Sequence, residues 1–466
     1  MVKNQIYLGR TRWVARAVNI HVHCHSHQGD LPGSHLQKRY INNSMSLKSL
    51  LKGTIDKQIS PAYSRYALAL LLTVNLLNYI DRQVLFAMFP LIKADLNLSD
   101  TALGFLGSAF MLSYMLAAPL FGWIGDHWSR LRLASGGVIV WSMATALAGF
   151  STGYKTLLAA RASVGIGEAS FGTVSPGLIA DYFPKEQRGR VLAWFYVAIP
   201  VGSALGYILG GILGQRFGWH AAFLVVGVPG LLLAIPIGLL AEPKRGGDST
   251  PTACRTGKPA MGYAAFFKNR SFVCNTMAMT AMTFAMGGLA QWLPSFLNRV
   301  HSLDVAKGSA LFGAVTVLAG ILGTMTGGWI GDRWQKRSSR GYLLVSGWGF
   351  LIGTPFAVLA LLSPTLTGCM IAIFVAEFFL FLNTGPLNTV IINITDPSIR
   401  AMAFACNIFF IHALGDAVSP SILGWLSDRW GLQNALLITP LSMAIAGLFC
   451  FICCRYVQAD MASTEA

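Results

Sequence analysis

Apolar runs of similar length follow one another along most of this chain, separated by short polar segments. Each run is close to the about 20 residues that a helix needs to cross the hydrocarbon core of a bilayer. The runs are continuous rather than alternating, which favours helices over the strands of a membrane barrel. We identify about twelve of them, near residues 66–90, 101–124, 132–151, 155–180, 190–214, 221–240, 271–297, 306–330, 342–362, 367–394, 401–425 and 432–455. The pattern predicts an all-α integral membrane protein with twelve transmembrane helices.

The composition excludes a soluble or disordered protein. Of the 466 residues, 54% are hydrophobic and only 12% are charged, whereas an ordinary soluble domain has about 25% charged residues. A water-soluble protein of this size could not cover its surface with so few charges, and a disordered chain would be far less apolar. The eight cysteines are too sparse for a disulfide scaffold.

The net charge of +16 raises the question of a nucleic-acid partner. Half of this charge comes from residues 1–65, which hold ten Lys and Arg against Asp30 and Asp56. Elsewhere the cations lie almost entirely in short loops, without a basic face that is interleaved with aromatic residues. We therefore expect the lipid bilayer as a partner and no nucleic acid. We also expect the chain to work as a monomer.

The loop cations predict the orientation of the spans. One set of loops, together with the segment after the last span, holds 17 Lys and Arg, and the opposite loops hold 6. Because cytoplasmic loops carry an excess of these residues, both termini are predicted to lie in the cytoplasm. The cell membrane, plasma or inner, is the expected location.

A polar and basic connection separates the first six predicted spans from the last six, which indicates two bundles joined by a cytoplasmic linker. The expected organisation is a basic, disordered tail over 1–60, an N-terminal six-helix bundle over 61–240, the linker over 241–270, a C-terminal six-helix bundle over 271–456 and a short tail over 457–466.

The tail contains one cluster that resembles a metal site, His21-Val-His23-Cys24-His25-Ser-His27. Alternating histidines on an extended chain can bind Zn²⁺, Ni²⁺ or Cu²⁺. We instead predict that residues 1–44 are an unstructured extension without a metal, either native or produced by an upstream start. The tail lacks the apolar segment of a signal peptide.

The two halves of the chain repeat each other in sequence. Gly122-Trp-Ile-Gly-Asp126-His-Trp128 returns as Gly328-Trp-Ile-Gly-Asp332-Arg-Trp334, at an offset of 206 residues. Gly214-Gln-Arg-Phe-Gly218 is echoed by Ser427-Asp-Arg-Trp-Gly431, at an offset of 213 residues. Two parallel six-helix repeats are the arrangement expected of major facilitator transporters.

The first repeated string resembles the superfamily signature G-x-x-x-D-R-x-G-R-R/K between the second and third helices. The first copy has His127 and Ser129 where the signature has Arg and Gly, and the second copy has Gln335 in the place of the glycine. In the family, the acidic and basic residues of this loop join the halves on the cytoplasmic side and separate as the transporter changes state. The resemblance implies a cytoplasmic gate, and a generic positive loop is the alternative. The candidate gate residues are Gly122, Asp126, Arg130, Arg188, Asp332, Arg333 and Arg400.

The first half of the chain holds four ionisable residues inside predicted spans. Each such residue costs about 2.5–3.5 kcal/mol on insertion scales and is a functional candidate. Glu168 lies near the middle of its span, and Arg161 is two helical turns earlier on the same face. Asp81 has a depth similar to that of Arg161, so a cavity-facing pair with Glu168 below it fits the geometry. Arg82 points about 100° away from Asp81, so the two cannot face the same partner.

These charges predict either proton coupling or a structural ion pair. Burial raises the pKa of a carboxyl group, and a nearby arginine lowers it. A carboxyl group held between the two effects can load and release a proton as access alternates. The alternative is a static ion pair that holds the first and fourth spans together.

Three further ionisable residues lie in predicted spans of the second half. Glu377 is in an aromatic stretch, and either a substrate or proton role or a packing role suits it. His412 and Asp416 are one turn apart in one span, where they could share a hydrogen bond. We place all three in the cavity at a lower rank.

A stripe of Gly202, Gly206, Gly210 and Gly214 at four-residue spacing predicts close helix packing rather than chemistry.

Three strings in the first half narrow the family. They are Asn78-Tyr-Ile-Asp81-Arg82, Gly165-Ile-Gly-Glu168-Ala-Ser170, and Arg188-x-Arg190 leading to Ala198-Ile-Pro-Val-Gly-Ser-Ala-Leu-Gly206-Tyr207. They resemble the Spinster branch of the major facilitator superfamily, strongly over 66–245 and more loosely beyond. The resemblance implies an alternating-access secondary transporter of sphingolipids or lysophospholipids, coupled to protons. It also implies that Asp81, Arg82, Arg161 and Glu168 form the coupling and headgroup site, with Asn78 beside them.

Other functions stay open on the sequence. A symporter of a small organic anion would pair Arg161 or Arg82 with a carboxylate, and it would have a closed polar cavity rather than a lateral opening for lipid. A transporter-shaped sensor would need a soluble output domain. No Walker A, G-x-S-x-G or H-E-x-x-H string occurs, so we expect neither an ATP-driven pump nor an enzyme, and no cofactor beyond the proton as coupling ion.

Overall fold

The computed structural model describes residues 60–243, 263–395 and 399–465, and all statements below concern these residues. Residues 1–59 of the predicted tail (1–60), with its histidine cluster, and residues 244–262 of the predicted linker (241–270) lie outside the described residues.

The described part of the chain is helical throughout. The first half contains α3 (Pro61–Ala87), α4 (Phe89–Leu96), α5 (Asp100–His127), α6 (Arg130–Ala148), α7 (Tyr154–Tyr182) and α8 (Lys185–Gly238). The second half contains the short 3₁₀ helix η1 (Tyr263–Lys268), α9 (Arg270–Val300), α10 (Val305–Gln335), α11 (Gly341–Leu362), α12 (Leu366–Phe381), α13 (Thr384–Asn393), α14 (Arg400–Ile411), the π-helical turn η2 (His412–Asp416), α15 (Ser419–Trp430), α16 (Leu432–Leu436), α17 (Ile438–Cys453) and α18 (Val457–Glu465). Among the described helices, nine are long and apolar enough to cross a membrane.

Polar caps explain where several of these helices begin. The side chain of Ser99 accepts a hydrogen bond from the backbone N–H of Ala102 at the start of α5, and Ser129 does the same at the start of α6. Asn269 caps α9 in the same way. Such caps satisfy N–H groups that have no partner within the helix.

The fifth and sixth predicted spans, 190–214 and 221–240, are joined differently from the prediction. The structure has one element, α8, whose helical geometry is interrupted at Gly218 (φ 81°, ψ 157°). A positive φ suits glycine, which has no Cβ. A single residue therefore turns the chain where the sequence suggested a short loop.

The glycine stripe packs α8 closely against α3, as predicted. A Cβ added at Gly206 would lie 2.6 Å from the backbone oxygen of Ile80, and one added at Gly210 would lie 2.9 Å from the Cα of Val84. Larger residues at these positions would push the two helices apart.

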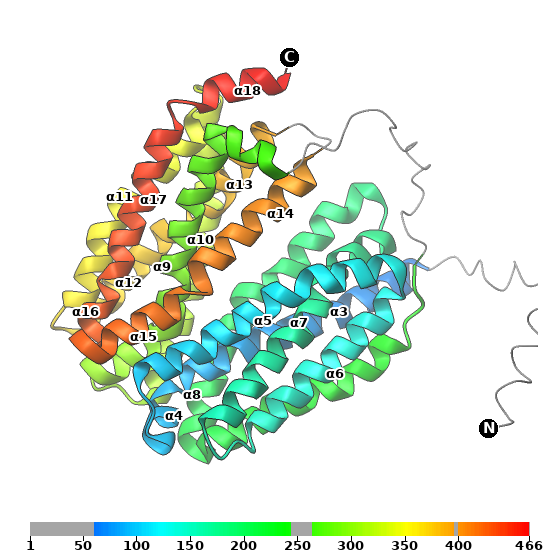
Figure 1. The fold of residues 1–466 in the computed structure, drawn as a ribbon, viewed down its shortest axis with the longest axis vertical. Coiled ribbons are helices and arrows are strands. Elements are labelled where there is room, and N and C mark those ends of the chain that lie inside the picture. Colours follow the sequence, from blue (N-terminus) through cyan, green and yellow to red (C-terminus); the bar gives the residue numbers. More distant parts are fainter. Residues whose placement is uncertain (1–59, 244–262, 396–398, 466) are drawn as a thin grey trace, which may run out of the picture. The chain divides into compact units, whose positions relative to one another are not determined.

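The helices of each half pack mainly against one another (Figure 1). The halves meet mainly through two helix pairs, α8 with α10 and α5 with α15, and also through smaller contacts such as those of α3 with α9 and of α5 with η2. We call the end of the helices that holds Asp100 and Asp428 the far end. The opposite end, which holds residues 122–130 and 328–335, is called the signature end.

Candidate functional site

Four charged side chains from α3 and α7 form two ion pairs inside the first half. The Nε of Arg82 donates a hydrogen bond to Oε2 of Glu168 at 2.6 Å. The Nη1 of Arg161 lies 3.8 Å from Oδ1 of Asp81. Adjacent residues of α3 thus face different partners on α7, as the helical geometry requires. We call these four side chains the charge network.

Burial distinguishes one member of the charge network from the others. The side chains of Arg161 and Glu168 are fully buried, and that of Asp81 is nearly so. The side chain of Arg82 keeps 18% of its surface exposed. Arg82 is therefore the more exposed of the two cations in the charge network.

The deeper pair is poorly supplied with hydrogen bonds. Thr145 on α6 donates a hydrogen bond to Oδ2 of Asp81. The three guanidinium nitrogens of Arg161 have no hydrogen-bond partner within the described residues. A buried polar group without a partner is costly, so a water or a substrate group that accepts hydrogen bonds would be stabilised at this site.

Aromatic rings surround the Arg82 guanidinium. Its Cζ lies 4.9 Å from the ring centroid of Tyr79, 5.0 Å from that of Phe110 and 5.2 Å from that of Tyr114. Phe110 also lies 5.3 Å from the Cζ of Arg161. Cation–π contacts at these distances stabilise a partly desolvated guanidinium. The sequence analysis missed this aromatic cage, because the rings of Phe110 and Tyr114 come from α5, on a span without charges.

Asn78, one turn of α3 before Arg82, is buried beside the Glu168 carboxylate. The structure thus brings together all five polar residues that the first-half motifs singled out.

The second half has a different site around Glu377 on α12. Its side chain is nearly buried, and Oε1 accepts a hydrogen bond from Thr316 on α10 at 3.1 Å. No ion pair of Glu377 occurs among the described residues, and its Oε2 has no hydrogen-bond partner there. Glu377 lies in the tenth predicted span, which corresponds in the repeat to the fourth span that holds Glu168. Among the described residues, Glu168 has a cation partner and Glu377 has none.

His412 and Asp416 do form the contact that their spacing suggested. The Nδ1 of His412 lies 3.0 Å from Oδ1 of Asp416 within the π-helical turn η2. Both side chains are partly exposed, and η2 packs against α9 and α5. Single π turns are frequent at functional sites.

The candidate gate residues make their described contacts within their own halves. Arg130 forms a 2.6 Å ion pair with Asp181 and also approaches Glu242 at 3.8 Å. In the second half, the Tyr342 hydroxyl donates a hydrogen bond to Asp332 at 2.7 Å. Arg188 Nε donates to the backbone oxygen of Phe183.

The remaining gate candidates lie near the same end. Asp126 is exposed in the last turn of α5, and Arg333 lies 5.9 Å from the Trp329 ring. A Cβ added at Gly122 or at Gly328 would meet no described atom within 4 Å. Arg400 begins α14, and its side chain lies outside the described part. The signature strings thus belong to helix ends rather than to loops.

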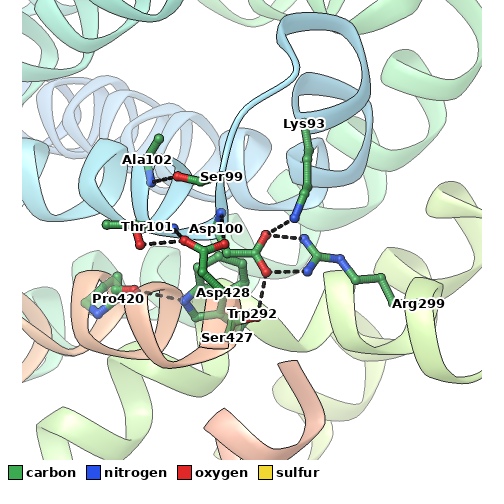
Figure 2. Close-up of polar contacts among 10 residues, drawn as sticks. All are labelled: Lys93, Ser99, Asp100, Thr101, Ala102, Trp292, Arg299, Pro420, Ser427 and Asp428. Atoms are coloured by element: carbon green, nitrogen blue, oxygen red, sulfur yellow. Dashed lines mark hydrogen bonds and ion pairs between the residues drawn. The ribbon is translucent and has the colours of Figure 1, made fainter. Parts of the chain in front are cut away.

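The far end, in contrast, carries polar contacts between the halves that the sequence analysis missed. Figure 2 shows Asp100 of α5 between Arg299 of α9 and Lys93 of α4. Both guanidinium Nη atoms of Arg299 donate to the Asp100 carboxylate, at 2.6 and 2.8 Å, and Ser427 of α15 donates as well. In the sequence, Lys93 and Arg299 stand out only as two of the six cations in the opposite set of loops. They line a pocket of about 520 Å³.

Comparison with known proteins assigns the family. The family model of the Major Facilitator Superfamily matches residues 71–420. Protein spinster homolog 1 of Homo sapiens is 36% identical to this chain over 394 residues, which cover 80% of this chain and 74% of that protein. The chain belongs to the Spinster branch of the major facilitator superfamily.

Other Spinster relatives agree with this assignment. The sphingosine-1-phosphate transporter SPNS2 of Mus musculus is 34% identical over 431 residues, which cover 85% of this chain and 78% of that protein. The crystal structure of a bacterial homolog to the human lysosomal transporter Spinster, in an inward-facing and occupied conformation, superposes with a TM-score of 0.77. That likeness covers 86% of this chain and 99% of the other at 24% identity, so it concerns the fold alone.

The Spinster resemblance in the sequence is therefore confirmed. The chain is an integral, multi-pass membrane protein and a transporter of the major facilitator superfamily, which is a family of transporters rather than enzymes.

Proposed function

We propose that this Spinster-like transporter couples the movement of an anionic, amphipathic lipid to protons by alternating access, and that the charge network is the coupling site. The observation that carries the proposal is the pair Arg82–Glu168, in which a half-buried guanidinium is held by a fully buried carboxylate. An anionic headgroup and Glu168 would compete for the same guanidinium.

The competition supplies a coupling rule. When Glu168 takes up a proton, it loses its charge and releases Arg82 to an anion. Proton binding and anion binding then favour each other, and this effect is reciprocal by linkage. The Asp81–Arg161 pair is more completely buried than Arg82, and Arg161 lies on the same face of α7 as Glu168. Asp81 is therefore the second carboxylate of the proposed site.

The residues around the Arg82 guanidinium favour a lipid as the substrate. The cage of Tyr79, Phe110 and Tyr114 presents apolar ring surface next to the cation, which fits the junction between a headgroup and a chain. The relative SPNS2 is named as a sphingosine-1-phosphate transporter, and a phosphorylated or otherwise anionic lysolipid is accordingly the proposed cargo. A small organic anion without a chain is the competing substrate.

The proposed topology has twelve spans with both termini in the cytoplasm. Counting α8 as two spans that meet at Gly218 supports this number, as does joining α12 to α13, α14 to α15 and α16 to α17. The excess of cations at the signature end supports a cytoplasmic placement of that end. The two bundles, 61–240 and 271–456, would then rock about the charge network, with the plasma or inner membrane as host and a monomer as the working unit. The proton is the proposed coupling ion.

Transport into proteoliposomes with an imposed pH gradient tests the proposal. Wild-type protein should move a fluorescent lysolipid faster with the gradient than without it, and the gradient effect should vanish in Glu168→Gln and in Asp81→Asn. Full gradient-driven transport in both variants would refute the coupling assignment. An excess of short organic acids should fail to compete with the lysolipid, and effective competition would favour the small-anion substrate.

A further inference from the structure

The second repeated string lies away from the charge network, at the far end. Its two copies, 214–218 and 427–431, each end in a glycine with a positive φ, 81° at Gly218 and 78° at Gly431. In each copy the residue before the arginine is a hydrogen-bond acceptor, Gln215 in the first half and Asp428 in the second. Both acceptors reach into the opposite half.

Asp428 on α15 caps α5 of the first half. Its carboxylate accepts the backbone N–H of Asp100 at 2.8 Å and that of Thr101 at 2.8 Å, and it also accepts the Thr101 hydroxyl (Figure 2). These N–H groups begin α5 and have no partner within the helix. A negative charge at this position is further favoured by the helix dipole.

Gln215 on α8 makes the reciprocal contact. Its Oε1 accepts the backbone N–H of Ala306, in the first turn of α10, at 2.9 Å. Gln215 and Asp428 are 213 residues apart, and Asp100 and Ala306 are 206 residues apart. These are the offsets of the two repeated strings, so the two contacts are copies of one arrangement in which each half caps a helix of the other.

The two caps are unequal. Asp428 is a carboxylate that accepts hydrogen bonds from three donors, whereas Gln215 is a neutral amide whose Oε1 accepts one, from the N–H of Ala306. Hydrogen bonds to an ionised acceptor are roughly twice as strong as neutral ones. Helix α5, which Asp428 caps, is also held to the second half by the ion pair of Asp100 with Arg299.

We propose that Asp428 and Gln215 are reciprocal inter-half helix caps that hold the far end closed, and that the Asp428 cap sets how often this end opens. The inference deepens the alternating access of the proposed function. Opening the far end moves α5 away from Asp428 and α10 away from Gln215, which removes the partners of these helix N-termini. The second repeated string is thus the far-end counterpart of the signature strings.

Distance measurements between spin labels test the caps in the full chain. Bioorthogonal labels at the exposed positions Ala94 on α4 and Thr367 on α12 would report the separation of the halves at the far end, in lipid nanodiscs without substrate or gradient. The loss of an N-cap shifts a helix equilibrium by about tenfold. We therefore expect Asp428→Ala to raise the ratio of open to closed distances by about tenfold, and Gln215→Ala by about twofold.

A matched control is Asp304→Asn, which removes a carboxylate at the same end whose one ion pair among the described residues is with Lys307, on its own side of the interface. Its distances should equal those of the wild type. Asp428→Asn keeps the side-chain volume and serves if the alanine variant does not fold, with an expected shift of about threefold. Wild-type distances in the foldable Asp428 variants, or a larger shift in Gln215→Ala, would overturn the proposal.

The measurement separates the caps from the coupling site. A shift in distances together with a failure of gradient-driven transport would leave the caps standing and remove the proton coupling. Unchanged distances together with normal gradient-driven transport would refute the caps and leave the proton coupling standing.

Discussion

The two halves of this transporter share a repeated helical scaffold but hold their charges differently. In the first half, Glu168 is paired with Arg82, and Arg161 and Asp81 pair behind them. In the corresponding helix of the second half, Glu377 has only the Thr316 hydroxyl as a described partner. Each half thus has a buried glutamate in this helix, but among the described residues only Glu168 is paired with a cation. This difference is the reason that we place the proposed coupling site in the first half.

The largest effect is expected when Arg161, the fully buried cation of the first half, is replaced. Arg161→Met leaves Asp81 buried without a counter-charge, and breaking a buried pair costs about 3–5 kcal/mol. We expect a lower thermal unfolding temperature in detergent and no gradient-driven transport. Combining it with Asp81→Asn should restore most of the stability but not the transport.

The exposed cation Lys155, on the same helix as Arg161, provides the control for that experiment. Lys155→Met should leave both stability and transport unchanged. If Arg161→Met were equally harmless, the Asp81–Arg161 pair would not be a structural part of the first half.

A second experiment makes the same substitution at Glu168 and Glu377, the buried glutamates of the two corresponding helices. Glu168→Gln leaves Arg82 without its charged partner and should lower the free energy of unfolding by about 2 kcal/mol. Glu377→Gln removes a buried carboxyl group that has no described cation beside it, so stability should stay unchanged or rise slightly. Chemical denaturation of both variants in the same detergent measures the difference, and equal losses would contradict the asymmetry.

The aromatic cage offers a smaller effect in the first half. Tyr79→Leu removes one ring from the Arg82 guanidinium, and a cation–π contact of about 0.5–1 kcal/mol corresponds to a two- to fivefold weaker apparent affinity for an anionic lysolipid. Tyr79→Phe keeps the ring and should bind as the wild type does. On the second half, Phe378→Leu beside Glu377 should not change affinity, as determined by concentration-dependent uptake.

The smallest effect is expected at the pair His412–Asp416. Both side chains are partly exposed, and a pair of this kind contributes about 0–1 kcal/mol. His412→Gln should therefore change the transport rate less than twofold in proteoliposomes. A tenfold loss would show that the second half also takes part in binding the proton or the substrate. It would contradict the difference between the halves described above.

The sequence predicted the transmembrane character, the two repeats and the Spinster family, because each depends on information that is local or periodic. Apolar runs of span length report the membrane directly, and the strings around Asp81 and Glu168 are contiguous. The pairing of Asp81 with Arg161 also followed from helical geometry. The join of the fifth and sixth predicted spans did not, because the positive φ of a single glycine is not visible in a hydropathy pattern.

Only the tertiary structure decided which side chains meet across helices. Arg82 finds Glu168 86 residues away, and its aromatic cage takes two rings from a helix without any charge in its interior. Asp428 reaches Thr101 across 327 residues, although both residues look like ordinary surface positions in the sequence. Composition and periodicity describe the face that each helix presents, whereas the partner of that face depends on how α3, α5, α7 and α15 pack. For this reason the sequence determined the family and the membrane, and packing decided the charge network and the far-end caps.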